Sequence, residues 1–141
     1  MRVLMIGRSK SIAFEELEKY WGEVIFAKPP KIRFEKYDLV VAQEPTPRIG
    51  IPAYLAAKLT GAKLVMEVHA DYIHSGLSPL QKFIAIHLLK RCDLVRAVSG
   101  KIARELEELG IGNVAMIPSI YIKTEVYRPM KPHSEREPII L

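Results

Sequence analysis

The segment CDLVRAVSGKIARELEELG, residues 92–110, contains a complete strand followed by a helix. Its apolar run over residues 93–98 predicts a buried strand, because short runs of this kind are typical of strands covered on both faces. Ser99 then stands at an N-cap position, and apolar and charge-paired side chains at helical spacing predict a helix that ends at Gly110. The rest of the chain follows the same alternation of strand and helix.

Further strands are predicted along the chain, with helices between most of them. The predicted strands cover residues 2–7, 23–27, 38–43, 63–68 and 113–117. One predicted helix follows Ser11, and its apolar face consists of Ala13, Leu17, Tyr20 and Trp21. A second predicted helix runs from near Ile51 to Gly61. A third runs from Ser78 to about Arg91, and its apolar face consists of Leu80, Phe83, Ile84 and Leu88. This order implies right-handed crossovers, so we predict an α/β fold: a doubly wound, mainly parallel, Rossmann-like sheet with helices on both faces.

The composition is that of a globular chain of 141 residues and 16.0 kDa. Its 49% apolar and 26% charged residues exclude a disordered, collagen-like or disulfide-stapled protein. The net charge of +5 would suit an anionic ligand, a nucleic acid or an acidic membrane, but it is spread evenly along the chain. Because there is no basic tail, we expect no nucleic-acid partner.

Single residue types indicate the environment of the protein. The lone Cys92 excludes an intrachain disulfide and is predicted to be a core thiol, which suits a reducing compartment. The apolar runs are far shorter than the roughly 18 residues that span a bilayer, so we expect a soluble, cytoplasmic protein. Scarce Asn and Gln beside abundant Lys, Arg and Glu are typical of thermophile proteins.

Polar residues follow most of the predicted strands, at the edge where open parallel sheets bind ligands. These candidates are Gly7, Arg8, Ser9, Gln43, Glu44, His69, Asp71, Ser99, Pro118 and Ser119. The first loop, GRSKSI over residues 7–12, lacks the three glycines of a dinucleotide-binding loop, so NAD and FAD are not expected. Its cations and hydroxyls suit a phosphate at a helix N-terminus and fit a solvated helix cap equally well.

His69 ends a predicted strand and is the candidate for chemistry. A histidine there can donate to a sugar hydroxyl or to a developing charge, although a core histidine satisfied by backbone groups fits the same position. His69, Asp71 and His74 lack the spacing of a known metal motif, so no metal site is expected.

Three segments, in this order, resemble the N-terminal half of the retaining family 4 (group 1) glycosyltransferases, which have the GT-B fold. The segments are GAKLVMEVHAD (61–71), CDLVRAVSGKIARELEELGI (92–111) and VAMIPSIYIKTEVYRP (114–129). The resemblance implies two Rossmann-like domains that face each other across a cleft. The N-terminal one mostly receives the acceptor, and the C-terminal one binds the nucleotide-sugar donor.

The resemblance also implies a division of the chain. Residues 1–120 would form the acceptor-side domain, residues 121–136 a linker between domains, and residues 137–141 the start of a truncated donor-binding domain. Because the donor-binding residues of the family lie in the missing half, we expect this chain alone to be inactive.

The resemblance assigns roles to individual residues. His69 matches the family histidine near the transferred sugar and is the predicted catalytic residue. The first loop and Ser99 match positions near the family's cleft, and together with candidates that follow strand ends the predicted substrate-binding residues are Gly7, Arg8, Ser9, Glu44, Asp71, Ser99 and Ser119. The chain departs from the family pattern at Gly7, where a glycine pair is usual, and at Ser119, Ile120 and Ile122, which replace Asn, Gly and Asp.

The implied reaction transfers a sugar with retention of configuration, without a metal or a cofactor. Its partners would be the nucleotide-sugar donor and a sugar or lipid-linked acceptor, and the positive charge is compatible with peripheral contact at the inner face of a membrane. Two alternatives remain at this point: a stand-alone binding or signalling module in which His69 is structural, and part of a nucleotide-sugar epimerase with its own acid and base carboxylates.

Overall fold

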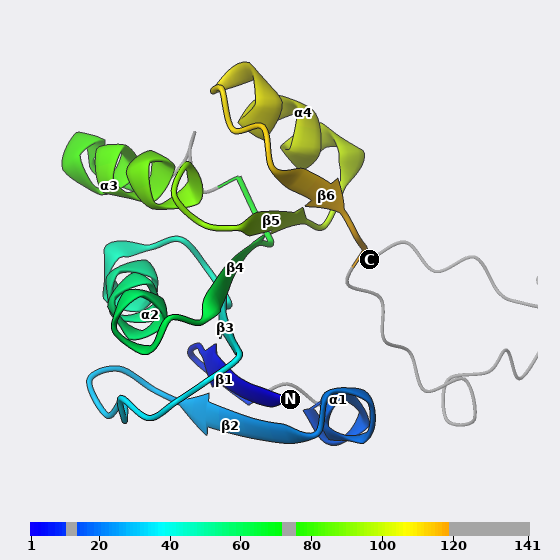
Figure 1. The fold of residues 1–141 in the computed structure, drawn as a ribbon. Helices are drawn as coiled ribbons and strands as arrows, with labels where there is room; N and C mark the ends of the chain where they lie inside the picture. Colours follow the sequence, from blue (N-terminus) through cyan, green and yellow to red (C-terminus); the bar gives the residue numbers. More distant parts are fainter. Residues whose placement is uncertain (11–13, 72–75, 119–141) are drawn as a thin grey trace, which may run out of the picture.

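The computed structural model describes residues 1–10, 14–71 and 76–118, in which strands and helices alternate (Figure 1). The strands are β1 (Arg2–Ile6), β2 (Glu23–Ala27), β3 (Leu39–Ala42), β4 (Lys63–Val68), β5 (Leu94–Ala97) and β6 (Val114–Met116). The helices are α1 (Phe14–Trp21), α2 (Pro47–Thr60), α3 (Pro79–Leu89) and α4 (Gly100–Glu108). Predictions for Ser11, Ala13, His74, Ser119, the linker and the last strand lie outside the described residues.

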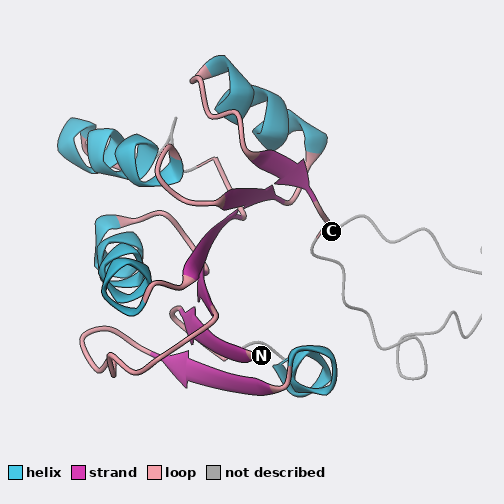
Figure 2. Cartoon of the chain, viewed as in Figure 1, coloured by secondary structure: helices cyan, strands magenta, loops and turns pink. Residues whose placement is uncertain are grey.

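The strands form one sheet in the order β2-β1-β3-β4-β5-β6, and every neighbouring pair is parallel (Figure 2). From β1 the chain passes to β2 at one edge of the sheet, whereas from β3 onward each new strand is added toward the opposite edge. Right-handed crossovers therefore put α1 on one face of the sheet and the other helices on the opposite face, as Figure 1 shows. The predicted α/β, Rossmann-like fold is confirmed.

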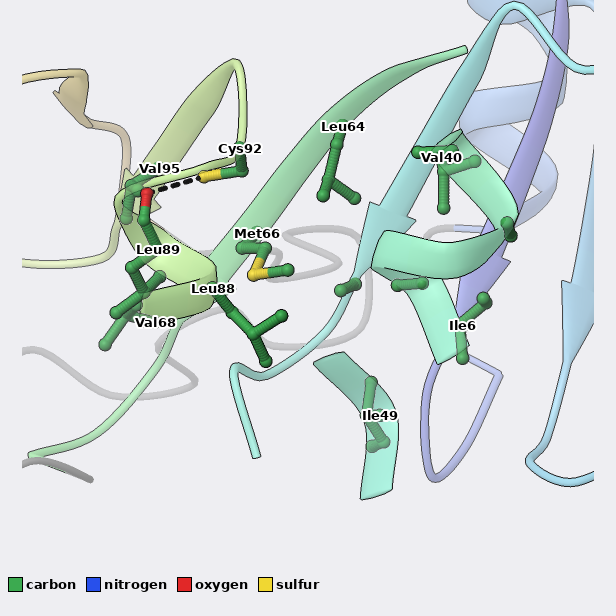
Figure 3. Close-up of a cluster of buried hydrophobic side chains, with 14 of the residues drawn as sticks. Ile6, Val40, Ile49, Leu64, Met66, Val68, Leu88, Leu89, Cys92 and Val95 are labelled. Carbon is green, nitrogen blue, oxygen red and sulfur yellow. Dashed lines mark hydrogen bonds between the residues drawn. The ribbon is translucent and has the colours of Figure 1, made fainter. Parts of the chain in front are cut away.

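The larger core lies between the sheet and the helices α2, α3 and α4. Figure 3 shows Met66 and Val68 of β4 in one buried cluster with Ile49 of α2 and Leu89 of α3. Burying side chains of this size stabilises the fold by roughly 1.5–3 kcal/mol each. A smaller cluster on the other face packs Leu17 and Trp21 of α1 against the sheet.

Cys92 belongs to the larger core, which confirms the predicted core thiol. Its Sγ donates to the carbonyl oxygen of Leu89 at 3.1 Å (Figure 3). Burial raises the pKa of this thiol to about 11. The side-chain amide of Asn113 donates to the carbonyl oxygen of Cys92 at 2.5 Å, which ties the start of β6 to the turn before β5.

The predicted start of α2 near Ile51 is wrong, because the helix already begins at Pro47. Thr46 is its N-cap residue, and the carbonyl oxygen of Thr46 accepts from the backbone N–H groups of Ile49 and Gly50. Pro52 lies inside the helix and removes one backbone donor there. The helix tolerates this loss so close to its first turn.

The predicted faces of two helices also need correction. On α1, Leu17 and Trp21 pack against the sheet, but Tyr20 is 83% exposed. On α3 the buried residues are Ala85, Leu88 and Leu89, while Leu80 and Phe83 are 67% and 64% exposed. A Cβ atom at Gly50 would lie only 2.8 Å from Cδ1 of Leu88, so close packing of α2 against α3 fixes how α3 is rotated.

Candidate functional site

The carboxyl ends of β1 and β3 lie side by side in the middle of the sheet. The chain leaves β1 toward β2 on one side, whereas the strands after β3 extend on the other side. Loops that follow two such strands diverge, and ligands of open parallel sheets bind in the crevice between them. Five of the predicted residues stand here: Gly7, Arg8, Ser9, Gln43 and Glu44.

Gly7 allows the loop after β1 to lie directly against β3. A Cβ atom at this position would stand 1.7 Å from Oε1 of Gln43, so any other residue would collide with that side chain. The Gln43 amide donates to the carbonyl oxygen of Ser9 at 3.1 Å and so holds the loop in place. Gly7 is thus needed for close approach of two loops.

A carboxylate is buried beside this contact. The side chain of Glu44 is only 6% exposed, and its Oε1 accepts from Nε of Arg8 and from Oγ1 of Thr46, both at 2.9 Å. Arg8 itself is 75% exposed. Glu44 therefore anchors a guanidinium group that faces solvent at the switch point, and guanidinium groups are well suited to bind phosphate.

A second polar cluster joins β4, β5 and β6. Glu67 and Arg96 are register partners on β4 and β5, and Nη1 of Arg96 forms an ion pair with Oε1 of Glu67. The same guanidinium donates from Nε to the carbonyl oxygen of Ile117 at 3.2 Å and from Nη2 to that of Pro118 at 3.1 Å. Arg96 thus connects the carboxylate on β4 to the chain that follows β6.

His69 belongs to the same cluster, because its Nε2 lies 3.1 Å from Oε2 of Glu67. The Glu67 side chain is 13% exposed and that of His69 is 36% exposed. Burial by itself raises the pKa of Glu67, but hydrogen bonds from His69 and Arg96 outweigh burial and hold this pKa below its ordinary value. An ionised carboxylate can only accept, so Nε2 of His69 carries the proton of this bond.

The remaining predicted residues have separate positions. Asp71 is half-buried, shortly after β4. Ser99 is the N-cap residue of α4, and its hydroxyl oxygen accepts from the backbone N–H of Ile102 at 3.3 Å. That contact agrees with the capping role predicted for Ser99, whereas contact with substrate stays a prediction.

Two residues of the second cluster, Glu67 and Arg96, were missed by the analysis of the sequence. Each is a charged residue inside an otherwise apolar strand, in KLVMEV and LVRA respectively. A charge in a strand that is covered by its neighbours is costly unless it is paired. The sequence did contain one signal for this pair: two successive apolar strands each carry one charged residue, and the two charges are opposite. This pattern indicates that the two strands are neighbours and that these residues face each other.

Two negative findings apply to residues 1–10, 14–71 and 76–118. Within these ranges, no three His, Cys, Asp or Glu side chains gather in a way that could hold a metal ion. No helix within them has the length and apolar character needed to cross a membrane.

The parallel sheet with helices on both faces defines a Rossmann-like domain, and polar groups line the carboxyl edge where sheets of this kind bind ligands. The model of Glycosyltransferase Family 4 matches residues 8–120, so the chain belongs to that family. The matched range contains Arg8, Glu44, Glu67, His69 and Arg96. The predicted family 4 glycosyltransferase N-terminal domain is thereby confirmed. None of the curated proteins compared with the chain matches it.

Proposed function

We propose that this chain is the acceptor-side domain of a retaining glycosyltransferase that moves a sugar from a nucleotide-sugar donor to an acceptor in the cytoplasm. The observation that carries the proposal is the pairing of His69 with Glu67 at the end of β4, inside the range that matches the family. Catalysis by this domain alone is not part of the proposal, because the donor would be bound mainly by a second domain.

Sugar transfer breaks the bond between the anomeric carbon and the diphosphate of the donor and forms a bond from that carbon to an acceptor oxygen. The proton of the acceptor hydroxyl leaves with the diphosphate. Positive charge develops on the sugar in the transition state, and groups that are already oriented stabilise such charge best. His69 is proposed to contact the transferred sugar, with its ring held by Glu67.

The cluster at the switch point is proposed to bind a phosphate group of a substrate. Arg8 is anchored through Nε by the buried Glu44 and presents an exposed guanidinium. Ser9 lies beside it, and Asp71, Ser99 and Ser119 are proposed as further substrate contacts along the same edge. The reaction is proposed to need neither a metal ion nor a cofactor.

The test is sugar transfer by an enzyme that carries this domain together with its donor-binding half. We expect His69→Ala to lower kcat by at least about 100-fold, as the loss of a group that stabilises the transition state commonly does. His87→Ala is the matched control, since His87 is an exposed histidine on α3. Initial rates with water-soluble acceptors and a panel of nucleotide-sugars measure both variants. Full activity of a folded His69→Ala enzyme would overturn the proposal.

A further inference from the structure

The outer faces of α2 and α3 are apolar, which is unusual for helices on the surface of a domain. On α2 the exposed large apolar residues follow one another at four-residue spacing: Ile51 is 38%, Leu55 47% and Leu59 71% exposed. On α3, Leu80 and Phe83 are 67% and 64% exposed. The two helices pack side by side on the same face of the sheet (Figure 1). We call these five residues the apolar stripe.

The core does not need the apolar stripe. The sheet-facing side of α2 is filled by Ile49, Ala53, Ala56 and Ala57, and that of α3 by Ala85, Leu88 and Leu89. Apolar side chains therefore cover both the inner and the outer side of these helices. An exposed apolar patch across two elements of a soluble fold marks a surface that contacts another body.

The two helices that carry the apolar stripe are also basic in sequence. Neither α2 nor α3 contains Asp or Glu, whereas α2 carries Arg48 and Lys58, and α3 carries Lys82 and is followed directly by Lys90 and Arg91. The next helix on the same face of the sheet, α4, is different. It has Lys101 and Arg104 together with Glu105, Glu107 and Glu108, and its buried residues are confined to Ala103 and Leu106. Among these three helices, only α2 and α3 combine exposed apolar residues with a sequence that has basic residues and neither Asp nor Glu.

We propose that the outer face of α2 and α3 docks onto the surface of a membrane that contains anionic lipid. Helices with Leu and Phe on one side and Lys and Arg around them lie at the boundary between headgroups and acyl chains, where both kinds of side chain are favourably placed. A second copy of the chain fits this face poorly, because its five basic residues would meet five others. The inference is independent of the proposed sugar transfer, since it concerns binding without any substrate.

The experiment is sedimentation of the 141-residue chain with lipid vesicles. We expect vesicles of phosphatidylcholine with phosphatidylglycerol to bind the chain at least about tenfold more tightly than vesicles of phosphatidylcholine alone. Salt should weaken this binding, because it screens charges that are exposed to solvent. Equal binding to both vesicles, or no binding to either, would overturn the proposal.

Variants separate the two contributions to binding. Leu59→Ser combined with Phe83→Ser should weaken binding to the anionic vesicles about tenfold or more, and Lys58→Gln combined with Lys90→Gln should remove the preference for anionic lipid. Tyr20→Ser is the matched apolar control, because Tyr20 is 83% exposed on α1, across the sheet. Arg104→Gln on α4 is the matched charge control. If the controls weaken binding as much as the stripe variants do, the face is assigned wrongly.

A spectroscopic measurement does not depend on the stability of these variants. The indole introduced by Phe83→Trp should show a blue-shifted emission on anionic vesicles and quenching by brominated acyl chains. Trp21 on α1 gives the constant background, which the parent chain measures directly. Membrane docking would be overturned if the emission of the introduced indole stayed typical of an exposed side chain on anionic vesicles. It would also be overturned if the emission shifted without vesicles, because the chain forms a dimer or binds an acidic protein instead.

Discussion

Glu67 of β4 and Arg96 of β5 stand opposite each other in the sheet, and their side chains form an ion pair near its carboxyl edge. Through this pair Arg96 holds the chain after β6, and Glu67 holds the ring of His69. A single carboxylate therefore links strand pairing to the position of the candidate catalytic group. Its charge state should be visible in both stability and activity.

We expect the free energy of unfolding to depend on pH through Glu67. The pKa of Glu67 is lower in the folded chain than its ordinary value, so the folded state binds a proton there less readily than the unfolded state does. The resulting stability is present above the ordinary pKa of glutamate and is lost as the pH falls through the lowered value. Glu67→Gln should cost about 1–3 kcal/mol at neutral pH, and this difference should shrink as the pH falls below the ordinary pKa of glutamate and through the lowered pKa of the folded state.

Urea unfolding of both proteins at several pH values measures this effect. Glu108→Gln is the control, because Glu108 is exposed near the end of α4. Its cost relative to the parent chain should be well below that of Glu67→Gln at neutral pH, because substitutions at exposed positions usually change stability little. A Glu67→Gln penalty that does not change with pH would show that the ionised carboxylate contributes no stability.

The fold could be predicted largely from local patterns. Apolar runs located every strand that the structure describes to within a residue or two, because a strand covered on both faces needs little else. The faces of α1 and α3 could not be predicted in this way. The rotation of α3 depends on Leu88 packing against Gly50, and nothing in either local sequence shows that these residues meet.

The positions of the candidate site residues at the strand ends were predictable to the same extent, and their roles stay predictions. The rule that ligands lie beyond strand ends located Gly7, Arg8, Glu44 and His69. The partners of these residues were not predictable, because they depend on which strands are neighbours and on their register. Arg8 pairs with Glu44 across 36 positions of sequence. Glu67 and Arg96 become partners only when β4 and β5 are aligned.

Gly7→Ala should destabilise the chain by about 1–3 kcal/mol, a usual cost of overpacking. The new methyl group would occupy the position of the Gln43 side chain, which would have to move and release the carbonyl oxygen of Ser9. Denaturant unfolding measures the loss. Combining Gly7→Ala with Gln43→Ala should recover part of it, because the shorter side chain removes the collision. Equal stability of Gly7→Ala and the parent chain would contradict the close approach of the two loops.

Cys92 should resist alkylation in the folded chain. Its thiol is buried and its pKa is raised to about 11, so very little thiolate is present near neutral pH. We expect iodoacetamide to modify folded Cys92 at least about 100-fold more slowly than the same chain in denaturant. Mass spectrometry of timed samples gives both rates. Rapid modification under native conditions would mean that the turn between α3 and β5 opens readily.

Glu67 should act on sugar transfer only through His69. In the complete enzyme we expect Glu67→Gln to lower kcat by about 10- to 100-fold, because a neutral amide holds the His69 ring less firmly. The double variant His69→Ala with Glu67→Gln should then be no slower than His69→Ala alone, since removing the ring leaves Glu67 nothing to orient. Initial rates and melting temperatures of all four proteins separate this coupling from a loss of folding. Losses that multiply in the double variant would show that Glu67 and His69 act independently, and Glu67 would then be a strand-pairing residue only.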